Sequence, residues 1–411
     1  MRVLYFHQYF TTPQSAGGTR SYEMAQRLIQ AGHEVTIVCG LKEHGLGELD
    51  GPFRYGRREG IIDGINVIEF NLPYSNHYNF WQRSFVFIHF ALNSIGISLT
   101  LKYDLIFATS TPLTASIPGI VARWIRRKPF VFEVRDLWPE LPREMGVITN
   151  KLVLSMMSVL EWISYHSAHR IICLAPGIVE GVIRRGIASE RITLIPNGCD
   201  LQQFGPSVTP WRPKIVRDNQ LLAVFTGAHG IANGLDAIIY AALELKKRNC
   251  TEIFILLVGD GKLKKDIRLQ AHQEGLEQIV HFMDPIPKIK LAELLAGADI
   301  GLQILANIPA FYYGTSPNKF FDYLSSGLPV LTNYPGWVAN LVSENNCGFS
   351  IPPDDPIAFA DALEAAHKNL QNLKQIGNNA RFLSVKQFNR DELGKKFVEC
   401  IESATMVKDS N

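Results

Sequence analysis

Residues 2–39, RVLYFHQYFTTPQSAGGTRSYEMAQRLIQAGHEVTIVC, decide the fold. They begin with an apolar, strand-like run, Arg2–His7, and end with a second one, His33–Cys39. Between the two runs lies Arg20–Ala31, whose apolar residues recur at the spacing of an amphipathic helix. A strand, a helix and a strand in this order are typical of parallel α/β architecture. The segment therefore predicts an α/β protein built on a parallel sheet.

The same alternation continues along the chain and then starts again. Residues 40–63 are polar and Gly-rich and predict a loop or an edge hairpin. Four further strand-like runs complete a first sheet of about six strands within residues 1–190: Ile65–Asn71, Leu105–Thr109, Phe130–Val134 and Ile171–Leu174. A second series follows: Leu221–Thr226, Ile253–Val258, Ile279–Met283, Ile300–Ile304 and Val330–Thr332. We therefore expect two Rossmann-like, doubly wound domains that face each other across a cleft.

The length of 411 residues also favours two domains over a single core. The strand pattern pauses at residues 200–215, where we place the junction. The expected organisation is an N-terminal domain over 1–205, a C-terminal domain over 206–380, and a helix and tail over 381–411. This last helix, at about 380–401, is charged and amphipathic, has no strand after it, and is expected to pack back across the junction.

Composition excludes several classes of protein. The formal net charge is +2 and no long Lys/Arg tract is present, so nucleic-acid binding is not predicted. The N-terminus runs directly into a strand, without the apolar region and cleavage site of a signal peptide. Six cysteines stand far apart, which favours a reduced, cytoplasmic protein without a Cys-x-x-Cys metal site: Cys39, Cys173, Cys199, Cys250, Cys347 and Cys400.

One segment has the composition of a membrane contact. The 18 residues between Arg83 and Lys102 carry no formal charge, but polar residues interrupt them, so we expect a surface helix rather than a span. Residues 71–130 carry six Lys/Arg against a single acid, Asp104. Aromatic residues are interleaved: Trp81, Phe85, Phe87, Phe90 and Trp124. The pattern indicates either an anionic membrane surface or a core helix beside a basic surface.

Glycine-rich loops follow the first strand of each half. Gly17 and Gly18 precede the first helix, and Gly227, Gly230 and Gly234 precede the helix of the second half. Such loops let backbone N–H groups approach an anion at a helix N-terminus, although a glycine pair also marks any tight turn. Two of them, each opening one half, predict a cleft between two nucleotide-type folds.

The most specific pattern is Thr315–Val330, TSPNKFFDYLSSGLPV. Pro317 is suited to a helix start, which leaves free N–H groups nearby. Lys319 then lies in the first turn, where a cation is electrostatically unfavourable. This placement is explained if Lys319 and the helix end bind the same diphosphate. Asp322 lies four residues after Asn318 on one helical face, where a carboxylate can accept from two ribose hydroxyls.

Together these segments resemble glycosyltransferase family 4, over essentially the whole chain. The resemblance rests on the GGTR loop, GHEVTIV, RDLWPE, LIPNGCD, the second glycine loop, VGDG, GADIGLQIL and SPNKFFDYLSSGLPV. It implies the GT-B fold and transfer with retention of anomeric configuration. RDLWPE with SPNKFFDYL looks most like the subgroup that includes N-acetyl-fucosamine transferases of bacterial surface polysaccharides.

The resemblance also implies roles for individual residues. Gly17 and Gly18 would face the diphosphate and the acceptor, and Asp322 would hold the ribose. Asp136 would place the acceptor, with a purely structural role before Trp138-Pro139 equally open. The remaining donor contacts implied by the resemblance and the loops are Gly227, Gly230, Asn233, Met283, Pro285, Ser316, Asn318 and Lys319. Gly18, Lys319 and Asp136 are the expected catalytic residues.

Two departures from the family pattern affect the site. The family's second loop carries an Arg and a Lys, which are Ala228 and Asn233 here. The first Glu of its E-x7-E motif aligns with Gly314. The cation that binds the diphosphate is therefore expected to be Lys319, with Lys262 or Arg20 as alternatives.

The expected function is a retaining transfer from a UDP-sugar to a lipid-linked saccharide in bacterial O-antigen, capsule or exopolysaccharide synthesis. UDP-N-acetyl-L-fucosamine is expected as donor, with UDP-N-acetylglucosamine second. Phe311, Tyr312 and Tyr313 either favour an apolar sugar methyl or pack beneath their loop. We expect no metal or other cofactor. The acceptor would carry a polyprenyl diphosphate, and the protein would lie peripherally on the inner face of the cytoplasmic membrane. The alternatives are a non-catalytic subunit that binds a nucleotide-sugar, and a nucleotide-sugar epimerase.

Overall fold

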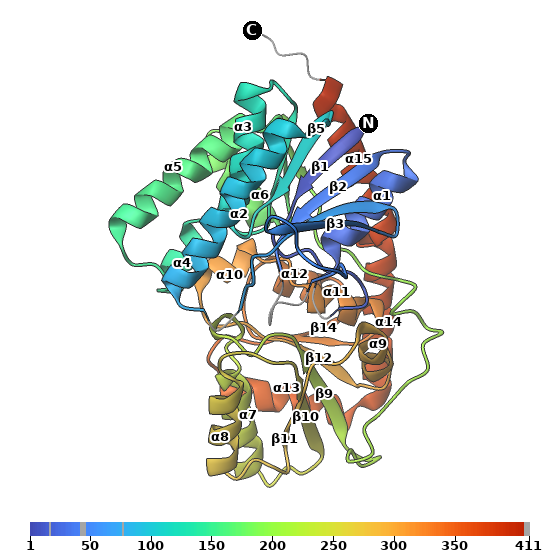
Figure 1. The fold of residues 1–411 in the computed structure, drawn as a ribbon. Coiled ribbons are helices and arrows are strands. Elements are labelled where there is room, and N and C mark those ends of the chain that lie inside the picture. Colours follow the sequence, from blue (N-terminus) through green and yellow to red (C-terminus); the bar gives the residue numbers. More distant parts are fainter. Residues whose placement is uncertain (16–17, 42–46, 76–77, 407–411) are drawn as a thin grey trace.

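The computed structural model describes residues 1–411 except 16–17, 42–46, 76–77 and 407–411. It contains two α/β domains, one above the other in Figure 1, each built on its own sheet. The two doubly wound domains expected from the sequence are confirmed.

Within the described residues, the first sheet has eight strands, of which only β3 runs antiparallel to its neighbour. Its order is β3 (Arg57–Ile62), β4 (Ile65–Phe70), β2 (Glu34–Cys39), β1 (Arg2–Phe6), β5 (Leu105–Thr109), β6 (Phe130–Val134), β7 (Arg170–Cys173) and β8 (Ile192–Leu194). The expected number, about six, was too small. The hairpin of β3 with β4 lies at one edge, and β8 has only three residues, too few for an apolar run to stand out.

The second sheet is entirely parallel and has six strands. Its order is β11 (Val280–Met283), β10 (Ile253–Val258), β9 (Leu221–Thr226), β12 (Ile300–Gln303), β13 (Val330–Thr332) and β14 (Gly348–Ser350). Its central strands are buried on both faces, which is why they are continuous apolar runs such as IFILLV. The short edge strand β14 was not predicted.

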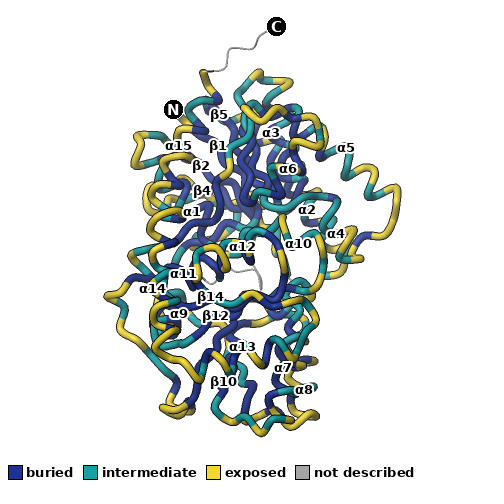
Figure 2. Tube along the Cα trace, turned by 180° about the vertical axis from the view of Figure 1, so that it is seen from behind, coloured by how far each residue is buried: buried dark blue, intermediate teal, exposed yellow. Residues whose placement is uncertain are grey.

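Helices cover the two sheets, as Figure 1 shows. Those of the first domain are α1 (Arg20–Gln30), α2 (Phe80–Thr100), α3 (Ile117–Ile125), α4 (Glu140–Glu144), α5 (Lys151–Ser167) and α6 (Pro176–Arg184). Those that follow are α7 (Asp236–Lys247), α8 (Lys264–Gln273), α9 (Lys288–Ala296), α10 (Pro309–Gly314), α11 (Asn318–Ser325), α12 (Trp337–Glu344), α13 (Pro356–Lys368) and α14 (Leu370–Gln387). Figure 2 shows the buried sheets at the centre and exposed residues along α5.

The chain returns to the first domain at its end. The expected single helix at about 380–401 is two helices, α14 on the second domain and α15 (Arg390–Met406) on the first. In Figure 1, α15 runs beside α1, and it also contacts β6 and β7. It buries Phe397 and Ile401 in the core of the first domain. The expected packing of this helix back across the junction is confirmed.

Candidate active site

A cavity of about 720 Å³ lies between the two domains. It is formed where strands of both sheets end, the position at which open α/β sheets bind ligands. In the part of the chain that the structure describes, five cations line the cavity against three acids, which favours an anionic ligand. The cations are Arg20, Arg135, Lys288, Lys319 and Arg390, and the acids are Asp136, Asp260 and Asp322.

The loop after β1 reaches the cavity at Gly18 and Thr19. Thr11 Oγ1 donates a hydrogen bond of 2.7 Å to the Gly18 carbonyl and so fixes this turn. A Cβ on Gly18 would come within 2.8 Å of the Asn318 side-chain nitrogen, so the loop closely approaches the start of α11 in the other domain. The expected contact at Gly17 lies outside the described residues.

Asn197 connects the end of β8 to the segment before α11. Its backbone N–H donates to Ser316 Oγ at 3.0 Å, and its side-chain amide donates to the Ser316 carbonyl at 2.6 Å. Pro317 follows and α11 begins at Asn318. The expected donor contacts Ser316, Asn318 and Lys319 therefore line the cavity together, held by a residue of the opposite domain.

Lys319 is half-buried in the cavity wall. Its Nζ donates a hydrogen bond of 2.6 Å to Asn233 Oδ1 and lies 4.3 Å from the centre of the Phe225 ring. Neither partner carries a negative charge, so burial lowers the pKa of Lys319 to about 7. Gly227, at φ +139°, allows the β9 loop to pack against this side chain. An anion in the cavity would supply the negatively charged partner that Asn233 and Phe225 do not provide for Lys319.

Asp322 lies further along the wall, with 8% of its surface exposed. Burial raises the pKa of its carboxyl, while the charges of Lys288 and Arg390 oppose that shift. This carboxylate, which is largely shielded from solvent, can accept hydrogen bonds from hydroxyl groups of a ligand. The geometry is compatible with the ribose contact expected for Asp322, which stays a prediction.

Asp136 and Arg135 line the first-domain side of the cavity. Asp136 accepts a hydrogen bond of 3.1 Å from Thr111 Oγ1, and burial raises the pKa of its carboxyl. The Arg135 guanidinium lies 3.4 Å from Nε2 of buried His7. Burial and the Arg135 charge hold the pKa of His7 well below its usual value, so the neutral ring accepts from Arg135. Arg135 and His7 were not predicted as site residues.

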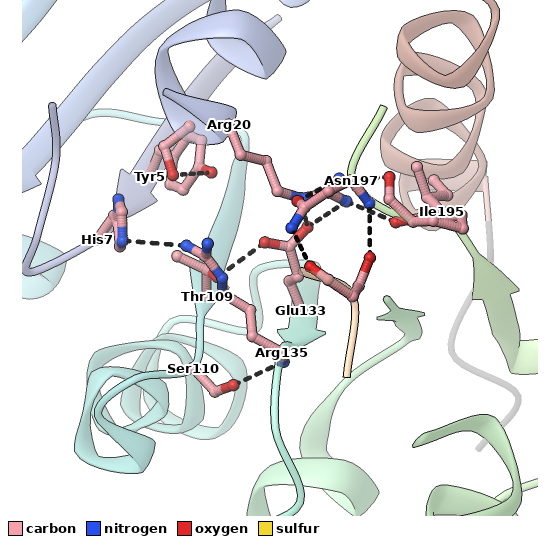
Figure 3. A network of polar contacts seen from close by, with 12 residues as sticks. Tyr5, His7, Arg20, Thr109, Ser110, Glu133, Arg135, Ile195 and Asn197 are labelled. Atoms are coloured by element: carbon pink, nitrogen blue, oxygen red, sulfur yellow. Dashed lines mark hydrogen bonds and ion pairs between the residues drawn. The ribbon is translucent and has the colours of Figure 1, made fainter. Parts of the chain in front are cut away.

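Arg20 forms a buried network, drawn in Figure 3. It pairs with Glu133 at 2.8 Å and donates to the carbonyls of Pro196 and Ile195, both at 2.8 Å. Thr109 Oγ1 donates to the other Glu133 oxygen at 2.8 Å. Because these contacts occupy its donors, Arg20 supports the wall structurally. The alternative in which Arg20 binds the diphosphate is therefore not favoured, and neither is Lys262, which is exposed outside the lining.

A buried histidine beneath the second loop also escaped prediction. His229 is fully buried, and neither ring nitrogen has a hydrogen-bond partner among the described residues. Burial, reinforced by the charge of Lys264, lowers its pKa to about 4, so the ring is neutral near pH 7. Gly259 packs beside it at φ +149°, where a Cβ would meet the Gly227 carbonyl oxygen at 1.9 Å.

The other expected contacts divide into two groups. Gly227, Asn233 and Pro285 line the cavity, whereas Gly230 and Met283 do not. Met283 holds the turn beside the cavity through its carbonyl, which accepts from the Gly259 N–H at 3.0 Å. Among the described residues, no three His, Cys, Asp or Glu side chains are grouped to hold a metal ion.

The three aromatic residues before Gly314 lie away from the cavity lining. Phe311 is buried in the second-domain core, and Tyr313 packs by its backbone against Gly177 of α6. The Tyr312 hydroxyl donates to Asn307 Oδ1. Phe311 packs beneath the loop, whereas the Tyr313 side chain is 57% exposed. Since none of the three lines the cavity, they give no support to a methyl-bearing sugar.

Two facing Rossmann-like domains with a cleft between them are the architecture of glycosyltransferases of the GT-B fold. Residues 15–198 match the family model of the glycosyl transferase 4-like domain, and residues 220–369 match that of glycosyl transferases group 1. Together the two models match most of the chain, which therefore belongs to the glycosyltransferases that combine these two domains.

Curated relatives support the same class. The D-inositol 3-phosphate glycosyltransferase of Paenarthrobacter aurescens is 25% identical over 219 residues, 52% of each chain. The O-antigen chain mannosyltransferase C of Escherichia coli is 22% identical over 258 residues, 61% of this chain and 65% of that protein. The chain thus spans about half to two thirds of the length of these relatives.

Solved structures show the fold over nearly the whole chain. The sucrose-phosphate synthase of Thermosynechococcus elongatus has a TM-score of 0.78 at 16% identity, covering 99% of this chain and 100% of that one. Anabaena HepE in complex with UDP-glucose has a TM-score of 0.68 at 16% identity, covering 98% and 100%. At these identities the likeness concerns the fold alone.

Proposed function

We propose that this glycosyltransferase moves a sugar from a UDP-sugar to a lipid-linked saccharide, with retention of anomeric configuration. The observation that carries the proposal is Lys319 at the N-terminus of α11, a half-buried ammonium group that has no acidic partner among the described residues. It faces a cavity that the opposite domain closes with Gly18. A diphosphate placed there would meet the ammonium group, the helix end and loop N–H groups together.

These groups act on the charge that develops in the reaction. The bond between the anomeric carbon and the diphosphate oxygen breaks, and its electrons leave with UDP. Lys319 and the N–H groups stabilise that charge more in the transition state than in the bound donor. The acceptor hydroxyl bonds to the anomeric carbon on the face that UDP leaves, and its proton passes to a diphosphate oxygen. Asp136 and Arg135 would orient the acceptor from the first-domain wall.

Several observations support parts of this proposal. HepE, a structural neighbour, forms a complex with UDP-glucose, and the E. coli relative is an O-antigen chain mannosyltransferase, as their names state. N-acetyl-L-fucosamine as the transferred sugar rests on the sequence resemblance alone, with N-acetylglucosamine second. The lipid-linked acceptor implies work at the cytoplasmic face of a membrane. Among the described residues, none of the helices is both long and apolar enough to cross a bilayer.

The nucleotide is tested by titrating the protein with UDP, GDP and dTDP. We expect UDP to bind tightest. A preference for GDP of more than about tenfold, roughly 1.4 kcal/mol, would overturn the nucleotide and the sugar together. The same assay run with donor and an extracted lipid-linked acceptor separates a transferase from a subunit that only binds.

Metal independence is tested with EDTA. The ammonium group and helix end supply the charge that a divalent ion would otherwise provide, so we expect transfer to continue after chelation. The measurement is the initial rate before and after EDTA, with dialysis as control. Loss of activity that Mn²⁺ or Mg²⁺ restores would contradict the mechanism.

A further inference from the structure

Helix α2 carries an apolar stripe that faces solvent. Trp81, Phe85, Ile88 and Leu92 recur at intervals of three or four residues and are 77%, 62%, 54% and 60% exposed. Because that spacing places them on one helical face, they form a continuous strip. The opposite face, including Phe90, is buried in the domain core. A helix that is apolar on both faces needs a second apolar neighbour.

Helix α5 carries a second stripe, which the sequence analysis did not single out. Leu152, Met156, Val159 and Trp162 follow the same spacing and are 70%, 65%, 56% and 50% exposed. Tyr165 points the other way and is buried. Exposed apolar residues scattered singly are ordinary, but two stripes of this length mark an interaction surface.

The two stripes belong to one layer of the first domain. Helix α3 packs against both α2 and α5, and Figures 1 and 2 show all three on the same side of the molecule. Trp124 and Ile125 at the end of α3 are 65% and 67% exposed. Trp124 Nε1 donates to Ser167 Oγ at 2.9 Å, which joins the ends of α3 and α5. We call these exposed residues of α2, α3 and α5 the apolar face.

Cations lie at the helix ends that border this face. Lys102 follows α2, Arg127 follows α3 and Lys151 opens α5, and all three are exposed. Two acids of this layer are paired within the domain: Asp104 with Arg2 at 2.8 Å, and Glu161 with Arg185 at 2.5 Å. The surroundings of the apolar face therefore favour an anionic partner.

The distribution of tryptophan indicates a bilayer rather than a protein. The chain has six tryptophans, and those classed as exposed in the described residues are Trp81, Trp124 and Trp162, all on the apolar face. Tryptophan, together with lysine and arginine, is the residue type that concentrates at the level of lipid headgroups. The apolar face thus has apolar stripes to enter the acyl region, and the cations at its border can contact the headgroups.

We infer that the apolar face docks on an anionic phospholipid bilayer, with α5 inserting beside α2. This inference rests on the proposed function, because a lipid-linked acceptor is the reason for the protein to bind a membrane. Its test does not depend on the donor. Docking through α2 and α5 would hold the first domain, with Asp136 and Arg135 on its cavity wall, against the membrane that carries the acceptor.

The test is flotation of the full-length protein with vesicles of equal parts phosphatidylglycerol and phosphatidylcholine. We expect binding that weakens in high salt and is much lower on pure phosphatidylcholine. Replacing Met156 and Trp162 together by glutamate should lower the partition coefficient about tenfold or more, because two large apolar side chains leave the interface. Glutamate at Tyr240 and Leu269, 48% and 55% exposed on the second domain, is the matched control and should change little.

Three outcomes would overturn the inference. These are no flotation of the wild-type protein with anionic vesicles, equal flotation of the α5 variant, and a stable wild-type dimer that the α5 variant disrupts without vesicles. Titration with UDP on both variants reports whether the cleft remains intact. A protein that floats as expected but prefers GDP would contradict the proposed donor and leave the docking surface standing.

Discussion

At the scale of single residues, Lys319 shows that a residue type unfavourable for the local helix can indicate function. A cation at a helix N-terminus opposes the helix dipole, and here burial adds a second penalty. Asn233 and the Phe225 ring contact the ammonium group without neutralising it. A bound anion would offset both the unfavourable helix dipole and the cost of burying the charge. The free energy that Lys319 costs the folded protein would then contribute to the affinity for the anion.

The first prediction concerns this side chain. Lys319→Ala should lower turnover by about 10²–10³, because one preorganised charge is lost from the developing anion. The fold should remain, since α11 is anchored by buried Phe320 and Phe321. The measurement is the rate of transfer together with thermal unfolding. Lys262→Ala, at an exposed lysine outside the cavity lining, is the control. Lys319→Ala activity within a few-fold of wild type would place the critical cation elsewhere.

The second prediction follows from the lowered pKa of Lys319, about 7 in the free protein. A bound diphosphate raises the pKa of Lys319, so at a pH above about 7 the protein takes up a proton when UDP binds. The affinity for UDP should therefore fall by up to about tenfold per pH unit from about pH 7 upward. For folding, the unfolded chain holds the proton up to its ordinary pKa of 10.5, so the free energy of unfolding should rise with pH across the same window. Calorimetric titration of UDP at several pH values measures the first effect. Lys319→Met should remove the slope, and a flat wild-type profile would refute the assignment.

At the scale of elements, the loop that follows β10 beside the cleft packs too closely to accommodate a side chain at Gly259. Gly259, after β10, has φ +149°, and a Cβ there would lie 1.9 Å from the Gly227 carbonyl oxygen. We predict that Gly259→Ala lowers the free energy of unfolding by about 2 kcal/mol or more through strain and overpacking. Gly230→Ala in the neighbouring loop has open space around its Cβ and should stay within about 0.5 kcal/mol. Urea denaturation compares the two, and equal stability would contradict this account of the strand ends.

The elements also show what the sequence can reveal. Long apolar runs such as Ile253–Val258 were predicted because full burial requires them. The three-residue edge strands β8 and β14 were not, because their residues are mostly half-exposed and carry no such run. The break between α14 and α15 at 388–389 was missed because both helices carry the same amphipathic pattern.

The same reasoning applies to the candidate site. Gly18, Asn318 and Lys319 were predicted because each belongs to a local motif that follows a strand or opens a helix. His7 and Arg135 come together only because β1, β5 and β6 are neighbours in the sheet, an order that local sequence does not contain. A lone histidine in an apolar context more often belongs to the core, so the sequence alone gave no reason to single out His7 or His229.

At the scale of the whole molecule, the chain crosses between the domains twice at one place. The Cys199 N–H donates to the Phe388 carbonyl at 2.6 Å, and the Arg390 N–H donates to the Cys199 carbonyl at 3.2 Å. Arg390 also pairs with Asp200 at 3.1 Å. The two crossings therefore lie side by side and form a single connection beside the cleft. If the two domains move relative to each other, the backbone of this connection has to bend.

The last prediction tests whether α15 is an integral part of the first domain, although it follows the second in sequence. Phe397 is fully buried and its ring meets that of Phe107 edge-on, with centroids 5.1 Å apart. Phe397→Ala should lower the free energy of unfolding by about 3–5 kcal/mol, because it removes a large core side chain and leaves a cavity. The exposed neighbour Lys396→Ala should change it by less than about 0.5 kcal/mol. Urea unfolding followed by tryptophan fluorescence measures both variants, since Trp81, Trp124, Trp138 and Trp162 all lie in the first domain. If Phe397→Ala unfolds like wild type, α15 is only an appended helix, and the double crossing cannot couple the two domains.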